Sequence, residues 1–149
     1  MKKGLIWILP GLTVLIADRV VKIITEGMYM NLIPGVIAIH SARNTGMALG
    51  LFQGNALMIL AVGAILACVC VMILRKMHLA GLAPLSLSLM AGGAIGNAAD
   101  RLIFGYVLDM FEFLFIDFYI FNVADVGVVC GAILCGYSLI FRPQDWREK

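Results

Sequence analysis

Residues 79–101 read LAGLAPLSLSLMAGGAIGNAADR, and this stretch indicates the class of protein. Residues 79–99 carry no charged side chain, and a helix needs about 20 mostly apolar residues to cross the hydrocarbon core of a bilayer. Asp100 and Arg101 follow directly, so the apolar run ends in polar groups. The stretch therefore predicts a membrane-spanning helix that has a polar end.

The composition of the whole chain agrees with this interpretation. Of its 149 residues, 62% are hydrophobic and 13% are charged, whereas soluble domains are about half apolar and about a quarter charged. This composition excludes a soluble globular domain and a disordered chain. The net charge of +2 is too small for the basic patch of a nucleic-acid-binding protein, so no nucleic-acid partner is expected. The length predicts a single domain, 1–149.

Four apolar stretches predict four membrane spans, at about 4–24, 55–75, 79–99 and 122–142. With a cytoplasmic N-terminus, seven basic residues lie on the cytoplasmic side and four on the other, which is the usual bias. Both termini are therefore expected in the cytoplasm. The first apolar run meets Asp18 and Arg19 rather than a small-residue cleavage site, so it is expected to remain as a span. The expected fold is an all-α, multi-pass membrane protein with a four-transmembrane-helix bundle.

Two segments between the spans differ from them. In residues 25–54, turn residues flank the β-branched run VIAI at 36–39, which predicts a short strand or a hairpin. Residues 109–121 are aromatic and are interrupted by acidic side chains, which is typical of a segment at the membrane–water interface. The bundle is therefore expected to carry a small extracytoplasmic β-rich cradle and an interfacial segment.

In this topology the polar residues of the spans converge near the outer face of the membrane. They are Asp18, Arg19 and Lys22 late in the first span, Asn97, Asp100 and Arg101 at the end of the third, and Asn122 and Asp125 at the start of the fourth. Charged groups inside spans are costly and usually mark function. For Arg19 the simpler interpretation is that it extends to the interface. Asp18 and Lys22 are four residues apart and can form an ion pair, which serves a structural or a functional purpose.

Five acidic residues between positions 100 and 125 could supply acid–base chemistry: Asp100, Asp109, Glu112, Asp117 and Asp125. Two carboxylates that share a site cannot both ionise cheaply, so one keeps a proton and the pair can activate a water molecule against an amide carbonyl. Spacing does not decide which two acids meet. Placement at the mouth of the fourth span favours Asp125, together with Asp100 or Asp109.

Other chemistries have little support in the sequence. The four cysteines lie in apolar runs, and the two histidines, His40 and His78, are not spaced as metal ligands beside them. No metal and no cofactor are expected. The alternatives to an enzyme are a small proton-coupled membrane transporter and a non-catalytic membrane scaffold. A transporter needs polar groups at the middle of the bilayer, whereas the polar residues of these spans gather near the outer face. A scaffold role would not explain the acidic residues.

Five motifs in this order resemble the lipoprotein signal peptidases (signal peptidase II), which are bacterial membrane aspartyl proteases. The motifs are DRVVK at 18–22, NTGMA at 44–48, GGAIGNAADR at 92–101, VLD at 107–109 and FNVAD at 121–125. They are spread along nearly the whole chain, so the resemblance is specific although each motif alone is weak.

The resemblance implies that Asp109 and Asp125 are the catalytic pair and that Asp100 is not catalytic. It also implies that six residues bind substrate or orient the dyad: Asn44, Gly46, Asn97, Arg101, Asn122 and Ala124. Asp18, Lys22 and Gly93 are expected to give structural support. One departure is Met110, where phenylalanine is frequent in the family, and we expect it to change the packing of the pocket rather than the activity.

The resemblance further implies a substrate class and a location. The substrates would be diacylglyceryl-modified prolipoproteins, cut just before the lipidated cysteine. The active site would lie near the outer leaflet of the bacterial cytoplasmic (inner) membrane. Apolar span faces and the aromatic residues at 111–115 would guide the acyl chains among membrane lipids. Because one chain contains the whole site, a monomer is expected.

Overall fold

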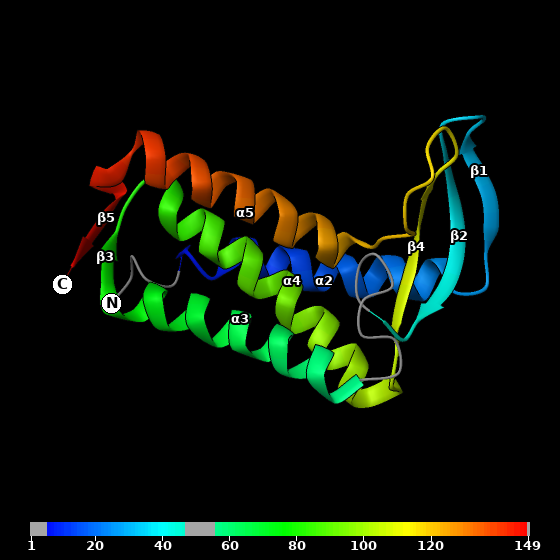
Figure 1. Cartoon of the computed structure of the whole chain (residues 1–149), viewed down its shortest axis with the longest axis horizontal. Coiled ribbons are helices and arrows are strands. Elements are labelled where there is room, and N and C mark those ends of the chain that lie inside the picture. The colour runs from blue at the N-terminus through cyan, green and yellow to red at the C-terminus, as the bar shows by residue number, and fades with distance from the viewer. Residues whose placement is uncertain (1–5, 47–55, 149) are drawn as a thin grey trace.

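The computed structural model describes residues 6–46 and 56–148 of the chain. Within these residues four long helices run alternately toward and away from a small antiparallel sheet at one end of the molecule (Figure 1). The helices are α2 (Leu9–Thr25), α3 (Ala56–Lys76), α4 (Leu82–Phe104) and α5 (Val123–Phe141). The ends of α2 and α4 and the start of α5 therefore meet beside the sheet, as the alternating topology predicts.

Three of the described helices are long and apolar enough to cross a membrane, at Leu57–Lys76, Leu82–Phe104 and Val123–Phe141. They correspond to the predicted spans at 55–75, 79–99 and 122–142. The predicted first span, 4–24, begins outside the described residues, and its described helix α2 has 17 residues. A bundle of four spans therefore stays a prediction, whereas a helical membrane fold with three candidate spans and a small sheet is confirmed.

Helix α4 begins and ends later along the chain than the predicted third span at about 79–99. Residues Met77–Leu79 form strand β3, which pairs with strand β5 (Trp146–Glu148) at the end of the molecule away from the larger sheet (Figure 1). The helix continues through the charged residue Asp100, because that side chain is buried and ion-paired. It ends instead before Gly105, whose φ of 78° is a left-handed conformation that suits glycine.

The backbone at the start of α4 donates a hydrogen bond to the C-terminal part of the chain. In the C-terminal tail after α5, residues Pro143–Asp145 form a 3-10 helix ahead of β5. The buried Asp145 carboxylate accepts the N–H of Leu82 at 3.0 Å. Trp146 and Asp145 also contact the Ser138 hydroxyl of α5. The tail therefore joins α4 to α5.

The larger sheet has the strand order β1-β2-β4. Strands β1 (Tyr29–Ile33) and β2 (Ile37–Asn44) form the hairpin that the sequence predicts between residues 25 and 54. Strand β4 (Val107–Phe113) pairs with β2, so the first part of the 109–121 segment is a strand. The sequence pattern did not indicate this strand, because its first four residues are all buried and do not alternate with exposed ones.

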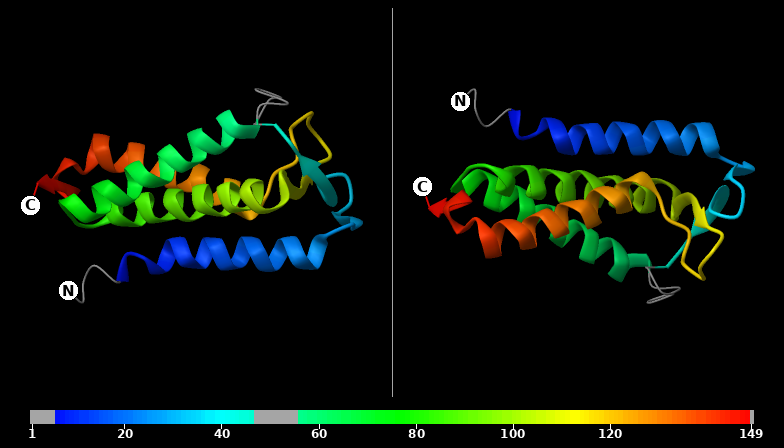
Figure 2. Two further views of the ribbon diagram at one scale, coloured as in Figure 1. Left: turned by 90° about the horizontal axis from the view of Figure 1, so that it is seen from below. Right: turned by 90° about the horizontal axis from the view of Figure 1, so that it is seen from above.

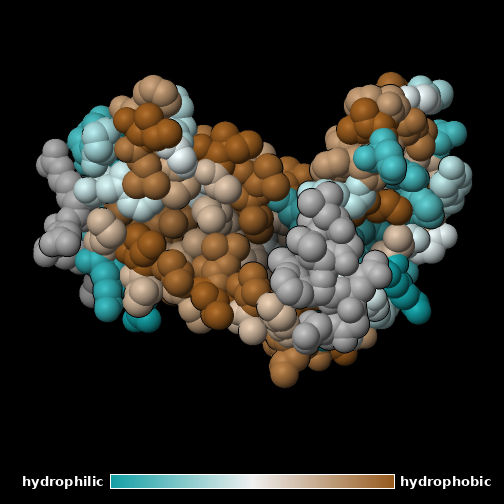
Figure 3. All heavy atoms as spheres, viewed as in Figure 1, coloured by the Kyte–Doolittle hydropathy of each residue, from teal (hydrophilic) through white to brown (hydrophobic). Residues whose placement is uncertain are grey.

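Helix α4 is the centre of the bundle and packs against α2, α3 and α5. Figure 2 shows α2 along one side of the other three helices. Small residues bring the backbones close together: Gly92 lies against Gly11 of α2, and Gly93 lies against Ala124 of α5. On the face shown in Figure 3, apolar side chains cover the helices and hydrophilic side chains gather toward the two ends. The exposed helix faces are therefore suited to lipid.

We expect Gly93→Ala to destabilise the protein, because an added Cβ would collide with the Ala124 carbonyl oxygen and lie 2.8 Å from Val128 Cγ2. Overpacking of this kind costs about 1–3 kcal/mol. Gly136→Ala on α5 is the matched control, because a Cβ there meets nothing within 4 Å. Thermal unfolding in detergent should show a lower midpoint for Gly93→Ala only. Equal midpoints for the two variants would contradict this account of the helix contact.

Candidate active site

Asp109 and Asp125 are brought together by Asn122, which lies between them in space. Asn122 is the N-cap of α5 and Asp125 is its third residue, and the two form a reciprocal capping box. The Asn122 side chain accepts the Asp125 N–H at 2.8 Å, and the Asp125 carboxylate accepts the Asn122 N–H at 3.1 Å. The Asn122 amide Nδ2 then donates to Asp109 at 2.6 Å. One asparagine therefore contacts both carboxyl groups.

Asp109 lies on β4 and is only 2% exposed. Its second oxygen accepts a hydrogen bond from Asn44 Nδ2 at 2.7 Å. Asn44 can reach it because β2 and β4 are paired with Ala42 opposite Asp109, so Asn44 is the diagonal neighbour on the same face. The sheet thus positions the first carboxyl group, whereas a helix positions the second.

The pKa of Asp109 is raised from its ordinary value of 3.8 to about 6. Burial is the main cause, since it disfavours the charged form. The nearby Asp125 carboxylate raises the pKa further, whereas the hydrogen bonds from Asn44 and Asn122 and the charge of Lys22 lower it. Asp109 is therefore a carboxyl group that can hold a proton close to neutral pH.

Asn97 holds Asp125 in place from α4. Its Nδ2 donates to Asp125 at 2.8 Å, and its Oδ1 accepts hydrogen bonds from Asn122 Nδ2 and Lys22 Nζ, each at 3.2 Å. Because the oxygen faces two donors, the amide nitrogen is directed at the carboxylate. Asn97, Asn122 and the two acids consequently form one connected hydrogen-bond network.

Lys22 lies behind this network and joins it to α2. Its ammonium nitrogen is 2.6 Å from Asp18 Oδ2 and 2.7 Å from Asp100 Oδ2. Asp100 is also paired with Arg19, and Asp18 accepts the backbone N–H of Ala124 at 2.9 Å. The predicted ion pair of Asp18 with Lys22 is confirmed. Asp100 lies in the ion-pair network and not beside Asp109 or Asp125.

Arg101 and Gly46 lie at the other side of the two acids. Arg101 donates to the Gly46 carbonyl at 3.0 Å and to the Asn97 carbonyl at 3.2 Å. The Gly46 N–H donates to Asn44 Oδ1 at 2.8 Å, which turns the Asn44 amide nitrogen toward Asp109. Residues 47–55, which include Met47 and Ala48 of the NTGMA motif, lie outside the described part of the chain.

A cavity of about 270 Å³ opens onto this cluster. Asp109 and Asp125 line it together with Asn44, Asn97, Asn122 and Arg101. Its remaining wall is mostly apolar and comes from α3, α4, β4, α5 and the segment before α5. The residues of this wall are Ile59, Val62, Gly63, Leu66, Ala94, Ala98, Val107, Tyr119, Ile120, Val128 and Val129. Two carboxyl groups that line one cavity can activate water for attack on an amide bond.

The structure adds residues to the site that the sequence did not single out. Tyr119 and Ile120 line the cavity, whereas Phe113 of the predicted 111–115 region packs against Phe118 and Phe121 with tilted rings. Ile59 and Leu66 of α3 also line it, and their spacing along one helix face is a signal that a sequence analysis could use. Five of the predicted site residues are not among those that line the cavity: Asp18, Lys22, Gly46, Gly93 and Ala124.

Comparisons with known proteins agree on one family. Residues 11–141 match the family signal peptidase (SPase) II. The chain is 36% identical to a lipoprotein signal peptidase from Lactobacillus johnsonii, over 95% of this chain and 96% of that protein. It is 37% identical to one from Clostridioides difficile, over 94% and 95%. A solved bacterial membrane enzyme is 30% identical, with a TM-score of 0.81 over 96% of this chain and 92% of that chain. Nothing in these likenesses supports a transporter or a scaffold.

We expect the free energy of unfolding of Asp109→Asn, relative to that of wild type, to increase from acidic to neutral pH. Because the pKa in the folded state is above its ordinary value, the folded protein binds more protons between about pH 4 and 6, and the free energy of unfolding falls as the pH rises through that window. The variant lacks this term, so its advantage should grow by up to about 3 kcal/mol between pH 4 and 7. Unfolding measured in detergent at several pH values tests this.

Asn44→Ala serves as the control for this pH dependence. It removes a hydrogen bond that favours the ionised form of Asp109. The fall in the free energy of unfolding should therefore occur at higher pH than in wild type. A difference between Asp109→Asn and wild type that stays constant with pH would show that Asp109 titrates normally.

Proposed function

Since the chain belongs to the signal peptidase II family of aspartic endopeptidases, which remove signal peptides from prolipoproteins, we propose that Asp109 and Asp125 are its catalytic dyad. The observation that carries this assignment is their shared position: both carboxyl groups line one cavity and both bond to Asn122. Asp100 shares a network with Lys22 and Arg19 instead. The other acidic residues between 100 and 125 do not line the cavity in the described part of the chain.

The dyad would hydrolyse the peptide bond with one proton shared between two carboxyl groups. The ionised carboxyl group takes a proton from water as the water oxygen attacks the carbonyl carbon, while the protonated group donates to the carbonyl oxygen. The tetrahedral intermediate then breaks its C–N bond: the carboxyl group that took the proton from water gives it to the leaving amine, and the other carboxylate takes the proton of one hydroxyl group as the carbonyl re-forms. The raised pKa of Asp109 fits the protonated role, although the titration belongs to the pair.

The surrounding polar residues would position substrate and dyad. Asn44 and Asn122 hold Asp109, and Asn97 holds Asp125. Arg101 holds the backbone at Gly46, where the absence of a side chain leaves room for a substrate backbone.

Four further residues would act through the positions of the helices. Asp18 and Lys22 fix the start of α5 through the N–H of Ala124, and Gly93 lets α4 and α5 approach at that point.

The apolar wall of the cavity supports a lipid-modified substrate. Ile59, Val62, Val128 and Val129 put aliphatic side chains beside the two acids. A diacylglyceryl-modified cysteine would place its acyl chains along α3 and α5 and its preceding peptide bond at the dyad. The bond cut would therefore be the one just before the lipidated cysteine.

The proposed setting is a bacterial cytoplasmic (inner) membrane crossed four times, with α2 as the first span. The whole of 1–149 would act as one peptidase domain. Both termini would be cytoplasmic, so the sheet would form an extracytoplasmic cradle and the site would lie near the outer leaflet. The bias of basic residues supports this orientation. One chain supplies all the polar residues of the cavity, which supports a monomer surrounded by membrane lipids.

We expect Asp109→Asn and Asp125→Asn each to lower the cleavage rate of a diacylglyceryl-modified prolipoprotein by about 10²–10⁴-fold, because each removes a general acid–base group. Purified protein in detergent and a gel-shift assay of the product are sufficient. Glu112→Gln is the matched control, since Glu112 is on the same strand and bonds to His40 rather than to the dyad. It should cleave at nearly the wild-type rate.

Asp100→Asn separates the two pairings that the sequence left open. We expect it to weaken the fold while cleavage by the folded fraction continues, because Asp100 pairs with Lys22 and Arg19. Loss of cleavage in well-folded Asp100→Asn together with retained cleavage in Asp109→Asn would contradict the assigned dyad.

A further inference from the structure

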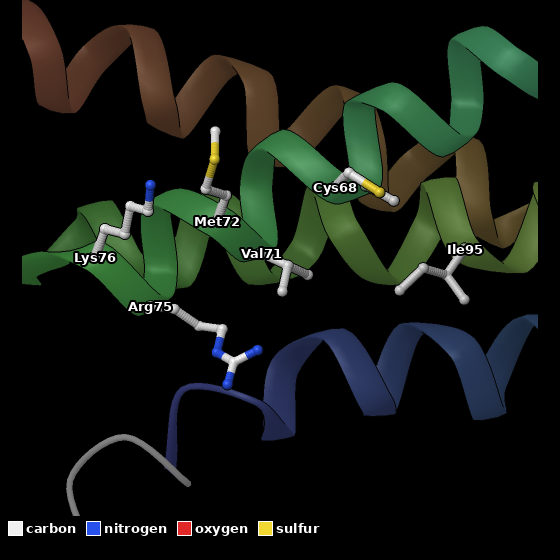
Figure 4. Close-up of a pocket in the computed structure, with 7 residues that line it drawn as sticks. Cys68, Val71, Met72, Arg75, Lys76 and Ile95 are labelled. Atoms are coloured by element: carbon white, nitrogen blue, oxygen red, sulfur yellow. The ribbon is translucent and has the colours of Figure 1, made fainter.

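A second and larger cavity, of about 570 Å³, lies on α3 away from the catalytic cluster. Its lining residues are six side chains of α3 between Ala67 and Lys76, joined by Ile95 of α4 (Figure 4). None of them lines the catalytic cavity. The volume is in the range of about 300–1,000 Å³ that is typical of small-molecule sites. We call this cavity the α3 groove.

The α3 groove is apolar along its length and basic at one end. Cys68, Val71 and Ile95 are exposed in the groove, whereas Arg75 and Lys76 occupy the last turn of α3. Figure 4 shows the Arg75 side chain extending from α3 in the direction of α2, and the Lys76 side chain extending away from it. None of the described residues that line the groove is acidic. The groove thus has an apolar channel with a positive end.

The position of the groove decides which partner fits it. It lies on Leu57–Lys76, the most hydrophobic of the candidate spans among the described residues, and most of the surface of this span is exposed. An exposed span in a membrane faces acyl chains, and its terminal basic residues lie at the level of the lipid headgroups. Basic residues at that level attract anionic lipids. An anionic phospholipid matches both parts of the groove, whereas a soluble anion matches only the basic end.

We propose that the α3 groove is a binding site for an anionic phospholipid. One acyl chain lies along Val71, Cys68 and Ile95, and the phosphate lies at the Arg75 side chain, while Lys76 adds positive charge on the other side of the last turn of α3. The site is separate from substrate binding, because the catalytic cavity is lined by other residues of α3.

The test is lipid retention by the purified full-length chain, measured by native mass spectrometry. The protein is taken from nanodiscs that hold phosphatidylglycerol and phosphatidylcholine with the same acyl chains, so that only the headgroup charge differs. Wild type should retain more phosphatidylglycerol than phosphatidylcholine. Arg75→Gln and Lys76→Gln should each reduce that preference about fivefold, the effect of one basic residue near an anionic headgroup.

Arg43→Gln is the charge-matched control, because Arg43 lies on β2 at the opposite end of the molecule, over the Tyr106 ring. It should leave the preference unchanged. Val71→Trp fills the apolar channel and leaves both basic residues in place, so it should reduce the retention of phosphatidylglycerol without changing net charge. Cleavage of a prolipoprotein by each variant shows that it is folded.

Four results would overturn the proposal. Equal retention of the two lipids by wild type would exclude selection of the anionic headgroup. An equal loss in Arg43→Gln and Lys76→Gln would show a general effect of surface charge. Displacement of the lipid by glycerol phosphate, or full retention in Val71→Trp, would exclude a role for the apolar channel.

Discussion

The ammonium group of Lys22 sets the arrangement of the helices at the sheet end of the molecule. It is buried and lies between Asp18 of its own helix and Asp100 of α4. A buried charge is tolerated only when it is paired, because its desolvation is costly. Asp18 also accepts the N–H of Ala124, and Lys22 donates to Asn97. The ion pairs therefore hold α2, α4 and the start of α5 in one relative position, and the asparagine network of the site is built on them.

Much of this architecture could be predicted because it follows from local patterns. Apolar runs of sufficient length predict helices at 55–75 and 122–142, since a bilayer requires that length. The i, i+4 spacing of Asp18 and Lys22 predicts a pair on one helix face. Alternating helix directions bring Asn97 and Asp125 to the same end, although 28 residues separate them. Turn residues around positions 36–39 predict the hairpin.

The rest depends on contacts between distant segments, which local patterns do not record. The register of β4 against β2 places Asp109 beside Asn44, and nothing in the spacing of the acidic residues distinguishes Asp109 from Asp100. Asp100 ends the uncharged run in the sequence, but α4 continues past it to Phe104 because Asp100 is paired with Lys22 and Arg19. Only the resemblance to a family distinguished the two aspartates before the structure did.

The contact between Asp145 and Leu82 has a consequence for the order in which the chain can be assembled. Gly81, which precedes α4, has no side chain that could accept the first N–H groups of that helix. The acceptor is the carboxylate of Asp145, which lies 63 positions after Leu82 and beyond α5. Because Asp145 lies beyond α5, the hydrogen bond at the start of α4 can form only after α5 has been synthesised. The first turn of α4 therefore takes its described form only in a chain that has been made as far as Asp145.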